Sequence, residues 1–157
     1  MRKSKARKRV VLPDPKFNDI LVATFINNLM WDGKKQTAQR IFYDAIDIIE
    51  KKHDGEGSGL DIFKSALDNI MPSVMVKSRR VGGATFQIPM EVKSNQKIAF
   101  GMKWLIKFSR NRNDKSMAEK LSSEILAASK GEGAAVKKKE DTHKMAEANK
   151  AFSHFRV

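Results

Sequence analysis

Residues 74–92 read VMVKSRRVGGATFQIPMEV, and this stretch differs in pattern from everything on either side of it. It is rich in Val, Ile, Thr and Phe, which favour β-strands. Gly82 and Gly83 stand in its middle and allow the positive φ angles of a tight hairpin turn. Pro89 cannot donate to a strand ladder, so its strand is an edge. The stretch predicts a two-stranded β-hairpin, which is marginal in water alone and needs a brace from outside the ribbon.

The sequence on both sides of the hairpin has apolar residues at helical spacing. We expect helices over about 17–29, 36–52, 60–70, 94–110, 115–129 and 134–151. Pro15 fits the first turn of a helix, and Asp32-Gly33 ends the first apolar run. The predicted fold is mainly α. It is a six-helix single domain over 13–157, with an inserted two-stranded β-hairpin arm at about 74–92 and a basic N-terminal arm over 1–12.

The charge of the chain restricts its partners. Its 157 residues carry 31 Lys and Arg against 18 Asp and Glu, a formal net charge of +13, and 41% of them are hydrophobic. A chain of that hydrophobicity folds, yet its positive charge repels itself unless a polyanion lies beside it. Nucleic acid and anionic membrane surfaces are the two polyanions of a cell, and both remain open on charge alone.

Nucleic acid is the favoured partner. The longest apolar-rich run, residues 20–31, is interrupted by Asn27 and Asn28 and falls short of the roughly 20 apolar residues of a spanning helix. The basic N-terminus leads into Pro13-Asp14-Pro15 rather than an apolar core, so we expect no secretory signal. The absence of cysteine excludes disulfides and cysteine-rich zinc sites, and it fits a reducing interior.

The first twelve residues are basic and contain no acidic residue. They form either a solvated tail or an arm that orders on phosphates, and the charge of the remaining chain favours the arm. The candidate RNA-binding residues of this arm are Arg2, Lys3, Lys5, Arg7, Lys8 and Arg9.

Basic residues also flank a turn before the second expected helix. Gly33 precedes Lys34 and Lys35, and Arg40 follows about one turn later. Backbone N–H groups at a helix start beside two ammonium groups suit a phosphate, although a solvated turn is an equal alternative. The pattern is not a Walker loop, because the preceding glycine and the following Ser or Thr are absent.

The hairpin is a stronger indication of RNA binding than the turn at Gly33. A two-residue turn at Gly82-Gly83 places Arg79 opposite Phe86 and Lys77 opposite Ile88, with Arg80 facing the other side. A ribbon face that mixes cationic and apolar groups suits RNA, with guanidinium on phosphate and Phe86 packing or stacking. Charged edges that prevent aggregation are the alternative. The hairpin candidates for RNA or tRNA contact are Lys77, Arg79, Arg80 and Phe86.

The fourth expected helix carries a basic stripe. Lys103, Lys107 and Arg110 recur at i, i+4 and i+7, and Arg112 and Lys115 extend the stripe into the next loop. The same helix carries an aromatic stripe, Phe100, Trp104 and Phe108, which we assign to the core or to a protein contact. The triplet of lysines at 137–139 precedes Glu140 and Asp141, so it is as consistent with a solvated face as with a contact.

Catalytic patterns are absent from the sequence. His53, His143 and His154 lack metal-ligand spacing, there is no cysteine nucleophile, and no serine lies in a G-x-S-x-G elbow. We expect no catalytic residue, no metal site and no cofactor.

Three separated blocks resemble one family. Residues 13–45, PDPKFNDILVATFINNLMWDGKKQTAQRIFYDA, closely resemble the signature of the bacterial small-subunit ribosomal protein S seven family. The hairpin block SRRVGGATFQIPMEV and the terminal block EDTHKMAEANKAFSHFR are similar to the same family. Val157 departs from the many members that end in an aromatic residue, which leaves the terminal contact open.

The resemblance implies a structural constituent of the small ribosomal subunit in the cytoplasm. It implies a primary binder of small-subunit rRNA that nucleates assembly of the head, or 3′ major, domain. Members lie at the subunit interface near the exit site, with the hairpin close to tRNA and messenger RNA. Their neighbours are small-subunit proteins nine and eleven, and we expect no homo-oligomer. Two alternatives are a helical DNA-binding protein and a repressor that acts chiefly on messenger RNA.

Overall fold

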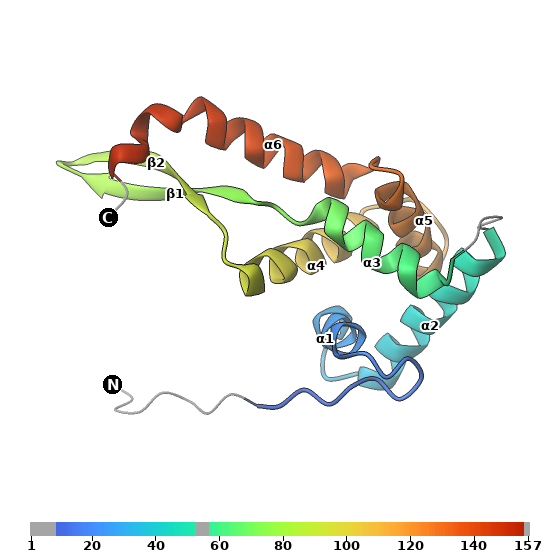
Figure 1. The fold of residues 1–157 in the computed structure, drawn as a ribbon. Coiled ribbons are helices and arrows are strands. Elements are labelled where there is room, and N and C mark those ends of the chain that lie inside the picture. Colours follow the sequence, from blue (N-terminus) through green and yellow to red (C-terminus); the bar gives the residue numbers. More distant parts are fainter. Residues whose placement is uncertain (1–8, 53–56, 156–157) are drawn as a thin grey trace. The chain divides into compact units, whose positions relative to one another are not determined.

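The computed structural model describes residues 9–52 and 57–155 (Figure 1). The chain divides into two compact units, Met1–Arg40 and Ile41–Val157. The structure confirms a mainly α fold with six α-helices and a two-stranded antiparallel hairpin among the described residues. None of their helices has the length and apolar character needed to cross a membrane.

The first unit contains α1 (Ile20–Leu29), which begins later than the sequence pattern predicts. Asp14 is buried, and its carboxylate accepts from the backbone N–H groups of Lys16 and Phe17 at 3.1 and 3.2 Å. These bonds close a tight turn, and Asn18 then takes a φ of 49°, which no helix continues through. Asp19 caps α1 by accepting from Leu21 N–H at 2.7 Å. Local side-chain bonds therefore prevent the helix from starting at Pro15.

The helix α1 has one buried face. Val22, Phe25 and Ile26 are buried, whereas Ile20 is 58% exposed. The helix α2 (Lys35–Lys52) follows a turn in which Asp32 and Gly33 have φ angles of 53° and 73°. The boundary between the two units lies within α2, after Arg40.

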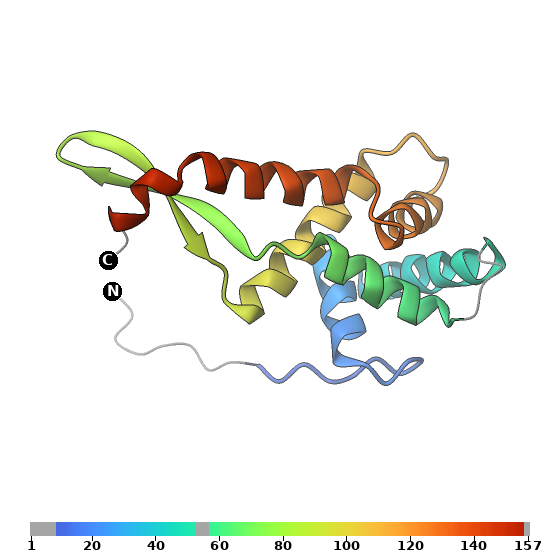
Figure 2. The same cartoon turned by 45° about the horizontal axis from the view of Figure 1, so that its top comes forward.

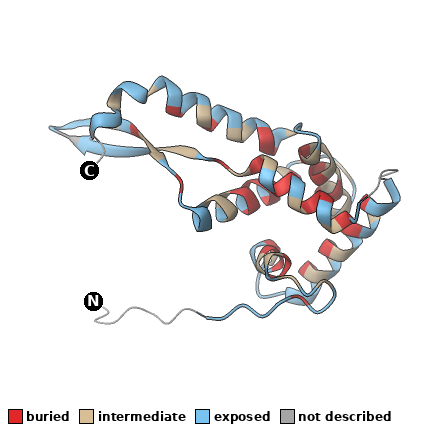
Figure 3. Cartoon of the chain, in the orientation of Figure 1, coloured by how far each residue is buried: buried red, intermediate tan, exposed pale blue. Residues whose placement is uncertain are grey.

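In the second unit, α3 (Gly59–Ile70), α4 (Ser94–Arg110) and α5 (Met117–Ser129) pack on one another as a helical layer. Figure 3 shows the buried residues of this unit concentrated on these helices. Phe63 of α3 meets Phe42 edge-on, with ring centroids 5.2 Å apart. Gly101 lets α3 and α4 approach closely, because a Cβ there would lie 3.0 Å from Met71 Cγ. The fully buried large side chains of this unit are Phe42, Ile46, Ile49, Phe63, Leu67, Ile70, Met102, Leu105, Leu121 and Ile125.

The hairpin forms as predicted, from β1 (Val74–Val81) and β2 (Ala84–Glu91). Gly82 and Gly83 have φ angles of 58° and 90°, the two positive angles of a type I′ turn. The register pairs Arg79 with Phe86 and Lys77 with Ile88, which confirms the predicted faces of the ribbon.

The brace that the ribbon requires comes from the C-terminal part of the same chain. The helix α6 (Ala134–Ala148) lies along the hairpin in both views, and a 3-10 helix, η1 (Lys150–Phe155), follows it against β2 (Figures 1 and 2). The Phe152 ring packs on Phe86 with centroids 5.3 Å apart. At the base of the hairpin, Ser73 N–H donates to His143 Nε2 at 3.1 Å. The predicted sixth helix thus ends at Ala148 rather than at 151.

Candidate nucleic-acid interface

The helix α4 has two contrasting faces. Met102, Leu105 and Ile106 are buried, while Lys103 and Lys107 are exposed. The segment contains no acidic residue, and the side chains of Lys103 and Lys107 have no hydrogen-bond or ion-pair partner among the described residues. Their positive charge is therefore available to an outside anion.

The remaining candidates next to α4 differ in their surroundings. Arg110 is exposed at the end of the helix, and Lys115 is exposed in the following loop. Arg112 is instead held by Glu124, whose carboxylate accepts from Arg112 Nε at 2.7 Å. Glu124 is only 1% exposed, and it also accepts from Ala135 N–H at 3.0 Å. The structure thus gives Arg112 a structural partner that joins the end of α4, α5 and the start of α6.

Trp104 belongs to the core side of α4, as the sequence predicts. It is 9% exposed, and its ring lies 6.0 Å from Phe100, centroid to centroid. Phe100 and Phe108 are half-buried. The aromatic stripe therefore packs mainly within the protein.

On the hairpin, Lys77, Arg79 and Arg80 are all exposed. The strands contain no acidic residue before Glu91, so residues 74–90 carry a net positive charge, all of it on β1. Phe86 is half-buried. Its contact with Phe152 covers part of the ring that we predicted to contact RNA. Its RNA contact stays a prediction.

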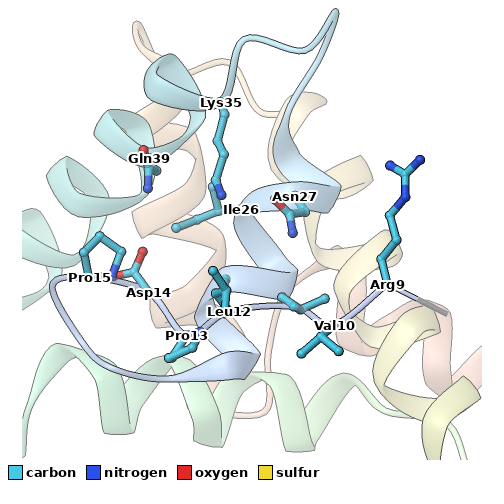
Figure 4. Close-up of a pocket in the computed structure, with 12 residues that line it drawn as sticks. Arg9, Val10, Leu12, Pro13, Asp14, Pro15, Ile26, Asn27, Lys35 and Gln39 are labelled. Carbon is cyan, nitrogen blue, oxygen red and sulfur yellow. The ribbon is translucent and has the colours of Figure 1, made fainter.

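The candidates of the first unit lie at the start of α2 and beside a pocket. Lys34 and Lys35 are exposed at the start of α2, and Arg40 is exposed one turn further on. A pocket of about 580 Å³ lies among residues 9–15, α1 and the start of α2. Figure 4 shows Lys35 extending towards Ile26, with Arg9 at the far end of the segment from Pro15.

Five residues of the basic arm lie outside the described residues: Arg2, Lys3, Lys5, Arg7 and Lys8. Their role as phosphate contacts therefore stays a prediction.

The base of the hairpin holds polar contacts that the sequence reading missed. Lys139 Nζ donates to the carbonyl oxygen of Asn69 at 2.9 Å, so one lysine of the 137–139 triplet is a structural residue. Burial and, to a smaller extent, the charge of Lys139 lower the pKa of His143 below its usual 6.5. The neutral ring is the form that accepts from Ser73. The only sequence signal for these contacts is the four-residue spacing of Lys139 and His143, which places both on one face of α6.

No group of three or more histidine and acidic side chains within residues 9–52 and 57–155 has a geometry that could hold a metal ion. The exposed cationic candidates of the described surface lie on α4, on the hairpin and at the start of α2.

Comparison with known proteins identifies the family. The family model for ribosomal protein S7p/S5e matches residues 1–150. The chain belongs to this family. Small ribosomal subunit protein uS7 of Flavobacterium psychrophilum is 68% identical over 157 residues, and that of Flavobacterium johnsoniae is equally similar, each alignment covering 99% of both chains. The uS7 protein of Cytophaga hutchinsonii is 61% identical over 156 residues.

Family membership confirms the resemblance drawn from the three sequence blocks. The protein is a structural constituent of the small ribosomal subunit, and its family is not one of enzymes.

Proposed function

We propose that this protein binds small-subunit rRNA directly and nucleates assembly of the head domain of the subunit. The observation that carries the proposal is the division of α4 into a buried apolar face and an exposed face with Lys103 and Lys107. A rigid helix packed on α3 and α5 holds these charges at fixed separations. Charges held at fixed separations position folded RNA through its phosphates.

The mechanism is phosphate neutralisation. RNA helices that meet at a junction repel each other, and each ammonium group that replaces condensed counterions lowers this repulsion. The stripe on α4, the turn at Lys34 and Lys35 and the arm over residues 1–12 would each hold a different RNA segment. Holding several segments on one protein brings them together, which is what an early assembly step needs.

The hairpin has a second role in this proposal. It extends along α6 away from the α3–α5 layer (Figure 2), and Lys77 and Arg80 are exposed on it. We assign it to the vicinity of exit-site tRNA and messenger RNA. Small-subunit proteins nine and eleven would be the protein neighbours, and one copy of the chain acts without forming a homo-oligomer.

The test compares two double variants of equal charge. Lys103→Ala with Lys107→Ala removes the stripe, and Lys137→Ala with Lys144→Ala removes two exposed lysines of α6. Filter binding to a head-domain rRNA fragment across a range of salt should give a slope reduced by about 2 for the first variant. The second variant should keep the slope of the unaltered protein, and both should retain its melting temperature.

Equal slopes for the two variants would contradict the α4 surface as the binding face. A control with duplex DNA at the same salt distinguishes rRNA binding from the alternative, DNA binding. Equal or tighter binding to the duplex would contradict rRNA as the target.

A further inference from the structure

A cleft of about 280 Å³ lies among the hairpin, α4 and α6. Its lining residues come from β1, β2, α4 and α6 and are Met75, Val76, Ser78, Gln87, Trp104, Lys138, Thr142 and Met145.

The lining follows from the register of the ribbon and the period of the helix. Ser78 pairs with Gln87, so both side chains stand on one face of the hairpin. Lys138, Thr142 and Met145 recur at i, i+4 and i+7, which puts them on one face of α6. The helix α6 lies beside the hairpin, and these two faces meet across the cleft.

The cleft combines apolar walls with polar groups that have no partner among the residues that the structure describes. Met75, Val76, Trp104 and Met145 supply the apolar surface, and Met145 is 42% exposed. The side chains of Ser78, Gln87 and Lys138 make no hydrogen bond or ion pair with any other described residue. The Thr142 hydroxyl, by contrast, already donates to the Lys138 carbonyl oxygen at 2.8 Å.

These groups define the ligand that would fill the cleft. It needs apolar faces, an edge with both donors and acceptors for the hydroxyl and the amide, and a negative charge near Lys138. The lining contains no carboxylate, and Arg80 stands on the same ribbon face as Ser78, two pairs nearer the turn. A nucleobase with its phosphate has all three properties. The volume admits one base and excludes a duplex.

We propose that this cleft binds a single unstacked base of single-stranded RNA, with the adjoining phosphate on Lys138. The inference rests on the proposed RNA-binding function and adds a base-contacting site to surfaces that otherwise contact phosphates. The amide of Gln87 and the hydroxyl of Ser78 each donate and accept, so the cleft accepts more than one base type.

The test uses the full chain with ¹³C-labelled methionine methyl groups and a hexa-adenylate RNA. Met75 and Met145 line the cleft, whereas Met117 of α5 and Met30 do not. We expect ring-current shifts at Met75 and Met145 and none at Met30 and Met117. A hexamer of the same sugar-phosphate backbone without bases, and a hexa-glutamate peptide, should leave the methyl groups of the cleft unshifted.

Two matched pairs of variants localise the contact. Lys138→Ala and Lys137→Ala change charge equally on neighbouring positions of α6, and only Lys138 lines the cleft. The second pair is Gln87→Ala and Thr85→Ala. Each removes an exposed, uncharged polar side chain from β2, and only Gln87 lines the cleft. Lys138→Ala and Gln87→Ala should weaken hexa-adenylate binding about tenfold, and the other two variants less than twofold.

Three results would overturn the proposal: binding of hexa-adenylate without shifts at Met75 and Met145, equal shifts with the baseless hexamer, or equal shifts with hexa-glutamate. The last would indicate an acidic protein partner. Each leaves the α4 stripe and its salt slope untouched, so failure of the cleft is distinct from failure of the proposed function.

Discussion

The helical layer and the hairpin arm of the second unit are stabilised in different ways. Phe63, Leu105 and Leu121 in the layer are completely buried, whereas Ile88 is the only buried residue among the strand side chains that the structure describes. The layer holds its shape by its own packing. The arm has almost no core, and it takes its support from α6 and η1, which are later in the sequence. Substitutions in the two regions should therefore differ in how much they lower the stability and in how far their effects extend through the structure.

The largest effect is expected in the layer. Phe63→Ala removes a fully buried ring that meets Phe42 edge-on, so it should cost about 3–5 kcal/mol of unfolding free energy. Chemical denaturation monitored by circular dichroism measures this cost. The arm residue Phe86, truncated in the same way, serves as the control and should cost much less. Equal losses of unfolding free energy for the two variants would contradict this difference between the two regions.

A smaller but still global effect is expected at the junction that leads into α6. Glu124→Ala leaves Arg112 and Ala135 N–H without their shared acceptor, at a cost of about 2–3 kcal/mol. Glu124→Gln keeps an acceptor for Ala135 and should recover part of the loss. Denaturation midpoints of the two variants measure the difference. If the glutamine variant were as unstable as the alanine variant, the charge of Glu124 rather than its bond to α6 would be the important property.

The third effect should be confined to the arm. Phe152→Ala removes the ring that packs on Phe86, an interaction worth about 1 kcal/mol. Hydrogen exchange should accelerate at the hairpin amides and stay unchanged in α3 and α5. Ser153→Ala alters an exposed neighbour in η1 and should change neither. Acceleration throughout the layer would show that the arm and the layer unfold as one unit.

The smallest effect concerns pH. The pKa of His143 is lowered in the folded protein, mainly by burial and then by Lys139, so the unfolded chain takes up the proton more readily. Stability contributed by the neutral ring is complete above the ordinary pKa of 6.5 and is lost as the pH falls towards the folded value. Comparing denaturation at about pH 7.5 and about pH 5.5 should show a smaller pH dependence for His143→Gln than for the unaltered protein. The same dependence in both would exclude this residue as its source.

Much of the fold was predictable because its signals are local. The two glycines at 82 and 83 specify the turn, and the turn fixes the register of the whole hairpin. Helix periodicity likewise located α3, α4 and α5 to within a few residues. The start of α1 was predicted wrongly, because the carboxylate of Asp14 closes a turn that an apolar pattern does not reveal.

The candidate site was predictable in composition but not in contacts. Exposure of Lys103 and Lys107 follows from helical spacing alone. The pairing of Arg112 with Glu124 joins positions twelve residues apart across a loop, and the pairing of Phe86 with Phe152 joins the arm to the end of the chain. Such partners depend on how elements pack, which periodicity does not specify.

The support of the arm by α6 has a consequence for the order of events during synthesis. A hairpin of this kind closes in roughly 1–10 μs once both strands exist. Its support begins at Ala134, well after the second strand ends at Glu91, and translation at roughly 5–20 residues per second takes seconds to reach it. The nascent arm is therefore a ribbon without a partner during that interval. The cleft on its inner face comes into being only when α6 docks, so a polypeptide that stops before α6 could build the helical layer but would lack the cleft.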